Sequence, residues 1–210
     1  MTKHGFTRLI TISAGVASLV TVITFTPAAT AIKARAVTTP GENSGEKISA
    51  SPFVTLMTGT VVPAAGSQLI REKDAVSMTA NTRGLTNGNI YTAWWAIFNN
   101  PENCFTRPCT PADINSNPAV QGALLFAGAR IVGPDGAASY GAYLAVGDTA
   151  FLHTGPGLLD PKHAEIHIAI RSHGLASALD ATQLAAALTS FNGGCPPNTC
   201  MTVQASVHAP

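Results

Sequence analysis

The sequence predicts an all-β fold, either an antiparallel β-sandwich or a barrel, with one short helix near the C-terminus. About seven or eight short apolar segments follow one another at fairly even spacing, each bounded by Gly, Pro or Asn. Strand–helix units do not repeat along the chain, which argues against an α/β fold.

The first strands are predicted at residues 53–62 and 75–82. The first segment is apolar and β-branched, and the second alternates apolar with small polar residues. Residues 90–98, Ile-Tyr-Thr-Ala-Trp-Trp-Ala-Ile-Phe, are apolar on both faces, which is typical of a central strand covered on both sides.

A long connection rich in Asn, Pro and Thr follows at residues 99–119. Residues 124–132 and 138–146 are both apolar, and Gly-Pro-Asp-Gly separates them. This arrangement predicts a β-hairpin.

Residues 163–171 alternate cleanly between Ile or Ala on one face and polar side chains on the other, which predicts a half-buried strand. Residues 180–190 combine Leu at a spacing of four with several Ala, and Asn-Gly-Gly follows, so the one helix is expected there. Residues 201–207 alternate again and predict a closing strand.

The composition excludes several partners. Of the 210 residues, 46% are hydrophobic and 11% are charged, and the formal net charge is +1. An apolar content of this size supports a folded core. Because like charges form no run, we expect neither nucleic-acid binding nor electrostatic attraction to anionic membranes.

The first 31 residues are predicted to be a secretory signal peptide. Lys3 and Arg8 precede an uncharged apolar stretch, and Ala-Thr-Ala at residues 29–31 ends it. Cleavage is expected after Ala31, with Ala36 as the second option. Residues 32–52 are small and polar and are expected to form a flexible linker, which leaves residues 53–210 as one β-sandwich domain. The mature protein is then secreted, outside the cell or in its envelope, and not inserted in the membrane.

Four cysteines stand in two pairs with a separation of five. In an exported chain an even count predicts disulfides, and three pairings are possible. We favour Cys104–Cys109 and Cys195–Cys200, because each pair encloses a short turn-forming sequence. The alternative is a zinc site made by all four cysteines.

The candidate metal site is centred on the polar face of the strand at residues 163–171. Alternate residues of a strand point the same way, and zinc and copper accept His nitrogen and carboxylate oxygen. The candidate ligands are His163, Glu165, His167, His173 and His153. The ends of the set are far apart on a regular strand, so one shared ion requires a bend. The alternative is a solvated sheet face on which Glu165 screens Arg171.

The sequence contains two other candidate sites. Ser139, followed in the chain by Asp148 or Asp160 and then by histidines, has the order of an α/β-hydrolase triad but lacks the strand-to-helix turn of such enzymes. Aromatic recognition of sugars or peptides is the other, with Tyr91, Trp95 and Arg171 as candidate ligand-binding residues. Core packing is the alternative role for these aromatic side chains.

Three blocks carry a resemblance over residues 55–210: YTAWWAIFNNPENC at 91–104, AEIHIAIRSHG at 164–174 and GGCPPNTC at 193–200. They resemble a group of exported microbial proteins of unknown activity, which implies one exported domain. The Gly-Leu at 84–85 and the Glu-Ile-His at 165–167 are also similar to chordin-type β-domains. Here Ala-Glu-Ile-His replaces the paired His-Ile-His of that pattern.

The sequence therefore predicts a secreted, non-catalytic binding or interaction protein without a cofactor, whose ligand is extracellular or belongs to the cell envelope. The alternative is a secreted metal-binding protein or metalloenzyme that uses zinc or copper on the His/Glu strand face.

Overall fold

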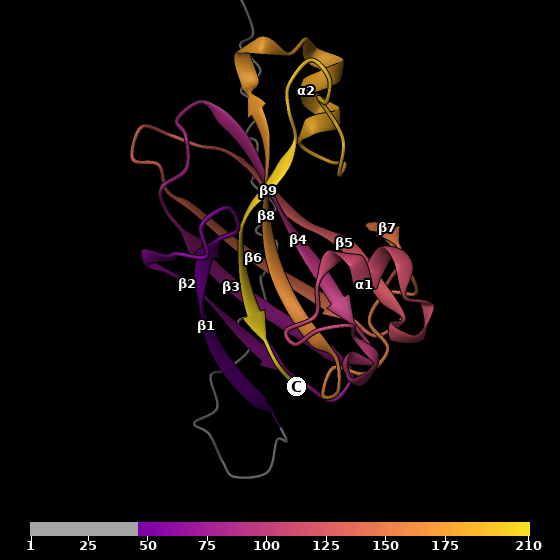
Figure 1. The fold of residues 1–210 in the computed structure, drawn as a ribbon. Coiled ribbons are helices and arrows are strands. Elements are labelled where there is room, and N and C mark those ends of the chain that lie inside the picture. The colour runs from indigo at the N-terminus through magenta and orange to yellow at the C-terminus, as the bar shows by residue number, and fades with distance from the viewer. Residues whose placement is uncertain (1–45) are drawn as a thin grey trace, which may run out of the picture. The chain divides into compact units, whose positions relative to one another are not determined.

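The computed structural model describes residues 46–210, all of which belong to one structural unit. The predicted signal peptide and most of the predicted linker lie outside the described residues. Nine strands form one antiparallel sheet that curls into a half-barrel, in the order β6-β3-β2-β1-β9-β8-β4-β5-β7 (Figure 1). The all-β prediction is confirmed.

The elements follow one another along the chain as strands with few helices. The strands are β1 (Lys47–Thr55), β2 (Val61–Arg71), β3 (Ala75–Thr82), β4 (Asn89–Phe98), β5 (Gly122–Ile131), β6 (Ala138–Ala145), β7 (Leu152–Thr154), β8 (Glu165–Leu175) and β9 (Met201–His208). The α-helices are α1 (Pro111–Ser116) and α2 (Ala181–Ala187), and three short 3-10 turns lie at Pro101–Asn103, Pro118–Val120 and Ala176–Ala178.

The N-terminal strands differ from the prediction. The segment expected to be one strand at 53–62 is the end of β1, a turn and the start of β2, because the chain reverses at Gly59, whose φ is +67°. β1 begins at Lys47, inside the stretch assigned to the linker. Most of β2 carries no strand signal in its sequence, because Pro63, Ala64, Ala65 and Gly66 have low β-propensity.

The core explains the two-sided pattern of β4. Tyr91, Ala93, Trp95 and Ile97 lie in the main hydrophobic core on the inner face of the sheet. Ala96 and Phe98 lie in a second cluster on the outer face, together with Cys109 and Val120 of the segment between β4 and β5. The prediction of a central strand covered on both sides is confirmed.

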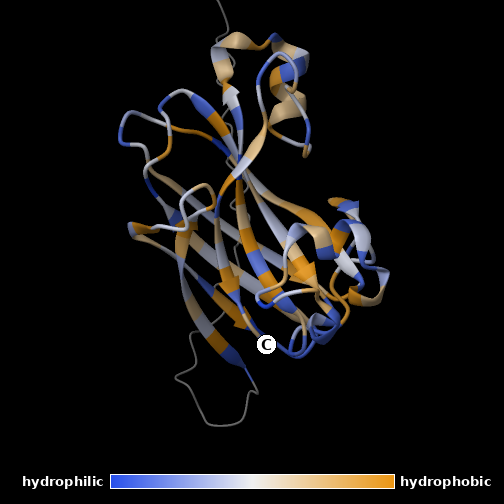
Figure 2. Ribbon diagram, viewed as in Figure 1, coloured by the Kyte–Doolittle hydropathy of each residue, from blue (hydrophilic) through white to orange (hydrophobic). Residues whose placement is uncertain are grey.

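β8 shows the alternation that the sequence predicts, and Figure 2 displays it as hydrophobic and hydrophilic bands along this strand. Ile166, Ile168 and Ile170 belong to the inner core. The strand starts at Glu165, two residues after the expected start at His163. Glu165 and His167 on its polar face are buried. The expectation that solvent covers this face is therefore wrong for these two residues.

The prediction that residues 124–146 form a β-hairpin is wrong. β5 pairs with β4 and β7, whereas β6 pairs with β3, so the two strands leave the turn at Gly133–Gly136 toward different neighbours. The turn chemistry was recognisable, since Gly136 has a φ of +63°. Curling of the sheet brings β5 and β6 near each other without a ladder of hydrogen bonds.

α2 confirms the predicted helix. Asp180 caps it by accepting a hydrogen bond from the backbone N–H of Gln183 at 2.8 Å, and the Gln183 side chain accepts in return from the backbone N–H of Asp180. The helix and its flanking loops lie at one end of β8 and β9, away from α1 (Figure 1).

Candidate functional site

The buried carboxylate of Glu165 organises the polar face of β8. Its Oε1 accepts hydrogen bonds from Nε2 of His167 and from the backbone N–H of Cys109, both at 2.7 Å. Arg107 Nη1 lies 3.7 Å from Oε2. The His167 ring packs on Phe98 with centroids 4.8 Å apart. Glu165 thus joins the long connection to the sheet and does not screen Arg171.

The pKa of Glu165 reflects two opposing effects. Burial raises it, but the hydrogen bonds from His167 and Cys109 together with the charges of His167 and Arg107 outweigh burial and hold the pKa below its usual value. The carboxylate is therefore ionised at neutral pH. Its oxygens are occupied by these partners, which suits anchoring of a loop more than transfer of a proton.

His173 is fully hydrogen-bonded in the interior. The carbonyl of Gly193 can only accept, so Nδ1 carries the proton and donates to it at 2.8 Å. Nε2 then accepts from the Thr92 hydroxyl at 2.8 Å, and that oxygen accepts from the Trp94 indole N–H at 2.6 Å. Burial lowers the pKa of His173, in keeping with this neutral form.

The other two histidines of the predicted metal set lie elsewhere. His163 is exposed and lies 3.3 Å from a carboxylate oxygen of Glu102. His153 is exposed and stacks on Phe191, with ring centroids 5.0 Å apart. The structure brings Glu165 and His167 together but does not assemble the five predicted ligands into one group.

A different group has the spacing of a metal site. Among residues 46–210, His173, Cys195 and Cys200 are the only three potential ligands of the His, Cys, Asp and Glu types whose ligand atoms lie within 4.8 Å of one another. The two sulfurs are joined in a disulfide, as are those of Cys104 and Cys109. Both predicted pairings are therefore present, and the four cysteines do not share one site. A disulfide sulfur is not a thiolate, so this group holds a metal only after reduction.

The three candidate ligand-binding residues also lie in different parts of the structure. Tyr91 is buried, and its hydroxyl accepts from the backbone N–H of Thr86 at 3.0 Å. Arg171 lies with Trp94 on the outer face, where it donates to the Phe191 carbonyl and covers that ring at 3.9 Å. Trp95 borders a cleft.

This cleft, which we call the seam cleft, lies between β5 and β6. It is lined by Leu125, Phe126 and Ala127 of β5, by Gly141, Ala142, Tyr143 and Leu144 of β6, and by Trp95, Asp148 and Phe151. Counted from the turn that joins them, Ala127, Phe126 and Leu125 would oppose Ala142, Tyr143 and Leu144 in a regular hairpin. The cleft therefore occupies the place where the hairpin ladder would have formed.

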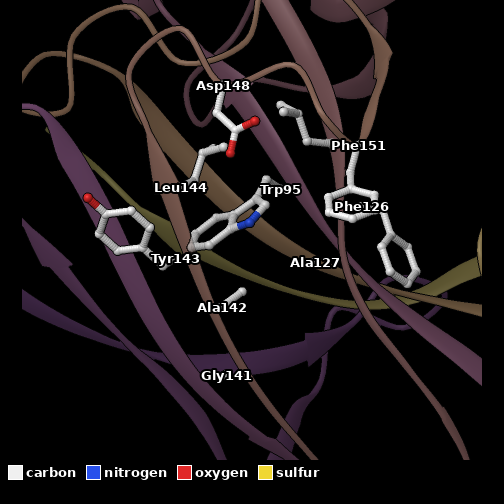
Figure 3. Close-up of a pocket in the computed structure, with 10 residues that line it drawn as sticks. Trp95, Phe126, Ala127, Gly141, Ala142, Tyr143, Leu144, Asp148 and Phe151 are labelled. Carbon is white, nitrogen blue, oxygen red and sulfur yellow. The ribbon is translucent and has the colours of Figure 1, made fainter. Parts of the chain in front are cut away.

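The seam cleft has a volume of 210 Å³, roughly that of seven water molecules. Figure 3 shows Trp95 at its centre, the Asp148 carboxylate beside it and Phe151 on another side, while the Tyr143 hydroxyl points away from Trp95. Phe151 and Tyr143 are exposed, so apolar surface continues from the cleft to solvent.

Two polar groups at the seam cleft have free hydrogen-bonding capacity. Asp148 Oδ1 accepts from the backbone N–H of Ala150 at 2.9 Å, and no cation pairs with this carboxylate among the described residues. The Trp95 indole N–H has no hydrogen-bond partner within residues 46–210. In this region Arg71 Nε is the one fully enclosed side-chain nitrogen or oxygen without a hydrogen-bond partner. The Trp95 N–H is therefore not fully enclosed and is accessible from the cleft.

Sequence reasoning missed a buried polar network on the inner face. The imidazole of His208 is hydrogen-bonded to Ser49 Oγ through Nδ1 and to Ser67 Oγ through Nε2, both at 2.8 Å. Ser206 is bonded to Ser67 at 2.6 Å. Burial lowers the pKa of His208 to about 4, and the charges of Arg71 and His167 act in the same direction. Ser206 lies in the strand predicted at 201–207, and His208 is the residue directly after it. Nothing in the sequence predicts their hydrogen bonds to Ser49 of β1 and Ser67 of β2.

Arg71 adjoins this network. Its guanidinium is fully buried and donates to the carbonyls of Pro161, Ala164, His208 and Ala209, at 2.5–3.1 Å. Burial lowers its pKa, whereas the charge of Asp160 raises it. These contacts join β2 to the chain segments before β8 and after β9, so Arg71 is a structural cation.

The hydrolase arrangement is not formed. The Ser139 hydroxyl donates to Asn81 Oδ1 at 2.7 Å on the exposed side of β6. Asp148 lies at the seam cleft, and Asp160 accepts from the backbone N–H of Lys162. Ser139 thus has no histidine as its hydrogen-bond partner within the described region.

No helix in residues 46–210 has the length and hydropathy needed to cross a membrane. Comparison of the chain with protein-family models, with curated proteins and with solved structures gave no match, so the resemblance based on the three sequence blocks stays a prediction.

Proposed function

We propose that this chain is an exported, non-catalytic binding protein and that its ligand occupies the seam cleft. The observation that carries the proposal is the unpaired stretch between β5 and β6, where strands joined by a tight turn enclose a cleft around Trp95. Hydrophobic walls with a few polar groups that fix orientation are typical of small-molecule sites.

The lining favours binding over catalysis. Asp148 is its one carboxylate, and the lining residues include no histidine, serine or cysteine to serve as a base or nucleophile. The disulfides and the predicted signal peptide support export to an oxidising compartment.

A fragment screen by NMR tests the proposal. The indole N–H signals of Trp95 and Trp94 report on opposite faces of β4, so a ligand in the seam cleft shifts the first and spares the second. Ala142→Phe fills the cleft and is expected to abolish the shifts, whereas Ala112→Phe, at an exposed position of α1, leaves them unchanged. A panel that leaves the Trp95 signal unmoved overturns the proposal.

The second candidate function is metal binding, and the proximity of His173, Cys195 and Cys200 favours it. Metal content is measured by mass spectrometry on protein purified without chelators or a His tag, before and after reduction. Near-stoichiometric zinc or copper that is lost in His173→Ala supports this function. Metal that is lost in His167→Ala instead assigns the site to the Glu165 face, and metal-free protein in both redox states rejects it.

A further inference from the structure

We infer that the ligand of the seam cleft is a small organic cation, an ammonium compound that also carries a hydrogen-bond acceptor. This inference rests on the proposed function and names the chemical class of its ligand. Three features of the cleft carry it: an unpaired carboxylate, aromatic walls and one free N–H donor.

The first feature is the charge of Asp148. The backbone N–H of Ala150 occupies one oxygen of the carboxylate, and the described residues supply no Lys, Arg or His within ion-pairing distance. The carboxylate is the only charged side chain in the lining. A cation that enters the cleft therefore meets a negative charge that the protein itself leaves uncompensated, next to apolar walls that reduce screening by water.

The second feature is the aromatic wall. Trp95 and Phe151 lie on two sides of the space next to Asp148 (Figure 3), and Leu125 and Leu144 complete the apolar surface. Aromatic faces attract cations, most strongly in the case of Trp, and methylated ammonium groups also bury their carbon atoms against such walls. A metal ion has no carbon atoms to bury against these walls and is strongly hydrated, so it gains less from them than an organic ammonium group does.

The third feature is the Trp95 indole N–H, whose residue is 2% exposed and whose donor has no partner among residues 46–210. By contrast, the Trp94 N–H is bonded to Thr92. Once a ligand displaces water from the cleft this donor needs another acceptor, so a ligand oxygen that accepts from Trp95 is favoured.

A neutral sugar fits these features less well. Each of its hydroxyl groups needs a partner once it is removed from water, and the side chains of the lining offer only Asp148, the Trp95 N–H and the outward-pointing Tyr143 hydroxyl. An anionic ligand is opposed by Asp148.

The test uses choline as the cationic probe and 3,3-dimethylbutan-1-ol as its uncharged counterpart, which has the same shape and hydroxyl group. Titration of the full mature chain is followed on the Trp95 indole signal. We expect choline to bind at least about tenfold more tightly than the neutral alcohol.

Asp148→Asn removes the charge but keeps the oxygen that accepts from Ala150, and it is expected to remove this preference. The matched control is Asp135→Asn, since Asp135 makes the same contact to the backbone N–H of Ala137 in a turn outside the cleft. Phe151→Leu is expected to weaken choline more than the alcohol.

The outcomes separate the two proposals. If the alcohol binds as tightly as choline, or if Asp148→Asn leaves choline binding unchanged, the cation inference is overturned and the cleft remains a binding site for neutral molecules. If choline, the alcohol and the whole fragment panel leave the Trp95 signal unmoved, the proposed function falls with it.

Discussion

The carboxylate of Glu165 accepts a hydrogen bond of 2.7 Å from the backbone N–H of Cys109, 56 residues earlier in the chain. This contact fixes one end of the Cys104–Cys109 loop against β8, where Phe98 and Val120 complete the second hydrophobic cluster.

Glu165→Gln is expected to lower the free energy of unfolding by about 1–3 kcal/mol, because the charge-assisted bonds from His167 and Cys109 are weakened inside the protein. Denaturant unfolding at pH 7 measures the loss. The control is Glu102→Gln, which alters the exposed contact with His163 and should cost less than about 1 kcal/mol. Equal effects of the two variants contradict a special role for Glu165.

Acid is expected to destabilise the protein through His208. The pKa of His208 is about 4 in the folded chain and about 6.5 in an unfolded chain, so the unfolded state binds more protons between these values. Stability therefore falls as the pH drops from about 6.5 and the loss is complete below about 4, reaching up to about 3 kcal/mol. His173, whose pKa is also lowered, adds a loss of the same sign.

The difference in unfolding free energy between the native chain and the His208→Gln variant isolates the contribution of His208. Unfolding free energies of the native chain and of His208→Gln are compared at several pH values from 7.5 to 4. The variant should be less stable at pH 7.5 but should lose less stability on acidification. Parallel curves for the native chain and His208→Gln would show that His208 does not carry the effect.

Removal of the buried guanidinium of Arg71 is expected to be severe. Arg71→Met leaves the carbonyls of Pro161, Ala164 and His208 without their donor, and the expected loss is about 3 kcal/mol or more. Arg130→Met, at an exposed position of β5, should change stability by less than about 0.5 kcal/mol. Thermal and denaturant unfolding of both variants check this expectation, and a mild effect at Arg71 contradicts it.

The two disulfides are expected to contribute modestly, since each closes a loop of only a few residues. Cys104→Ser with Cys109→Ser should lower stability by about 2 kcal/mol, and so should Cys195→Ser with Cys200→Ser. Melting with and without a reducing agent is the measurement. A melting temperature of the native chain that is unchanged by complete reduction argues against both contributions.

Several features of this protein follow from the local pattern of the chain. β4 and β8 were predictable because their side chains alternate or are apolar throughout, and burial of those faces dominates the energy of a strand. α2 was predictable because Asp180 and the Ala-rich stretch after it act within one or two helical turns. The two disulfides were predictable for the same reason, because the two cysteines of each pair are separated by only five positions in the sequence.

The tertiary structure alone decided which strands pair, and through pairing it decided the site. The turn at Gly133–Gly136 is a correct local prediction, but β5 pairs with β4 and β6 pairs with β3, and the two strands do not pair with each other. Curling of the sheet then brings Trp95, Asp148 and Phe151 together around the unpaired stretch. In the same way, His208 meets Ser67 across 141 residues. Local patterns determine which face of a strand is buried, whereas contacts between distant strands depend on the register of the whole sheet, which no short stretch of sequence specifies.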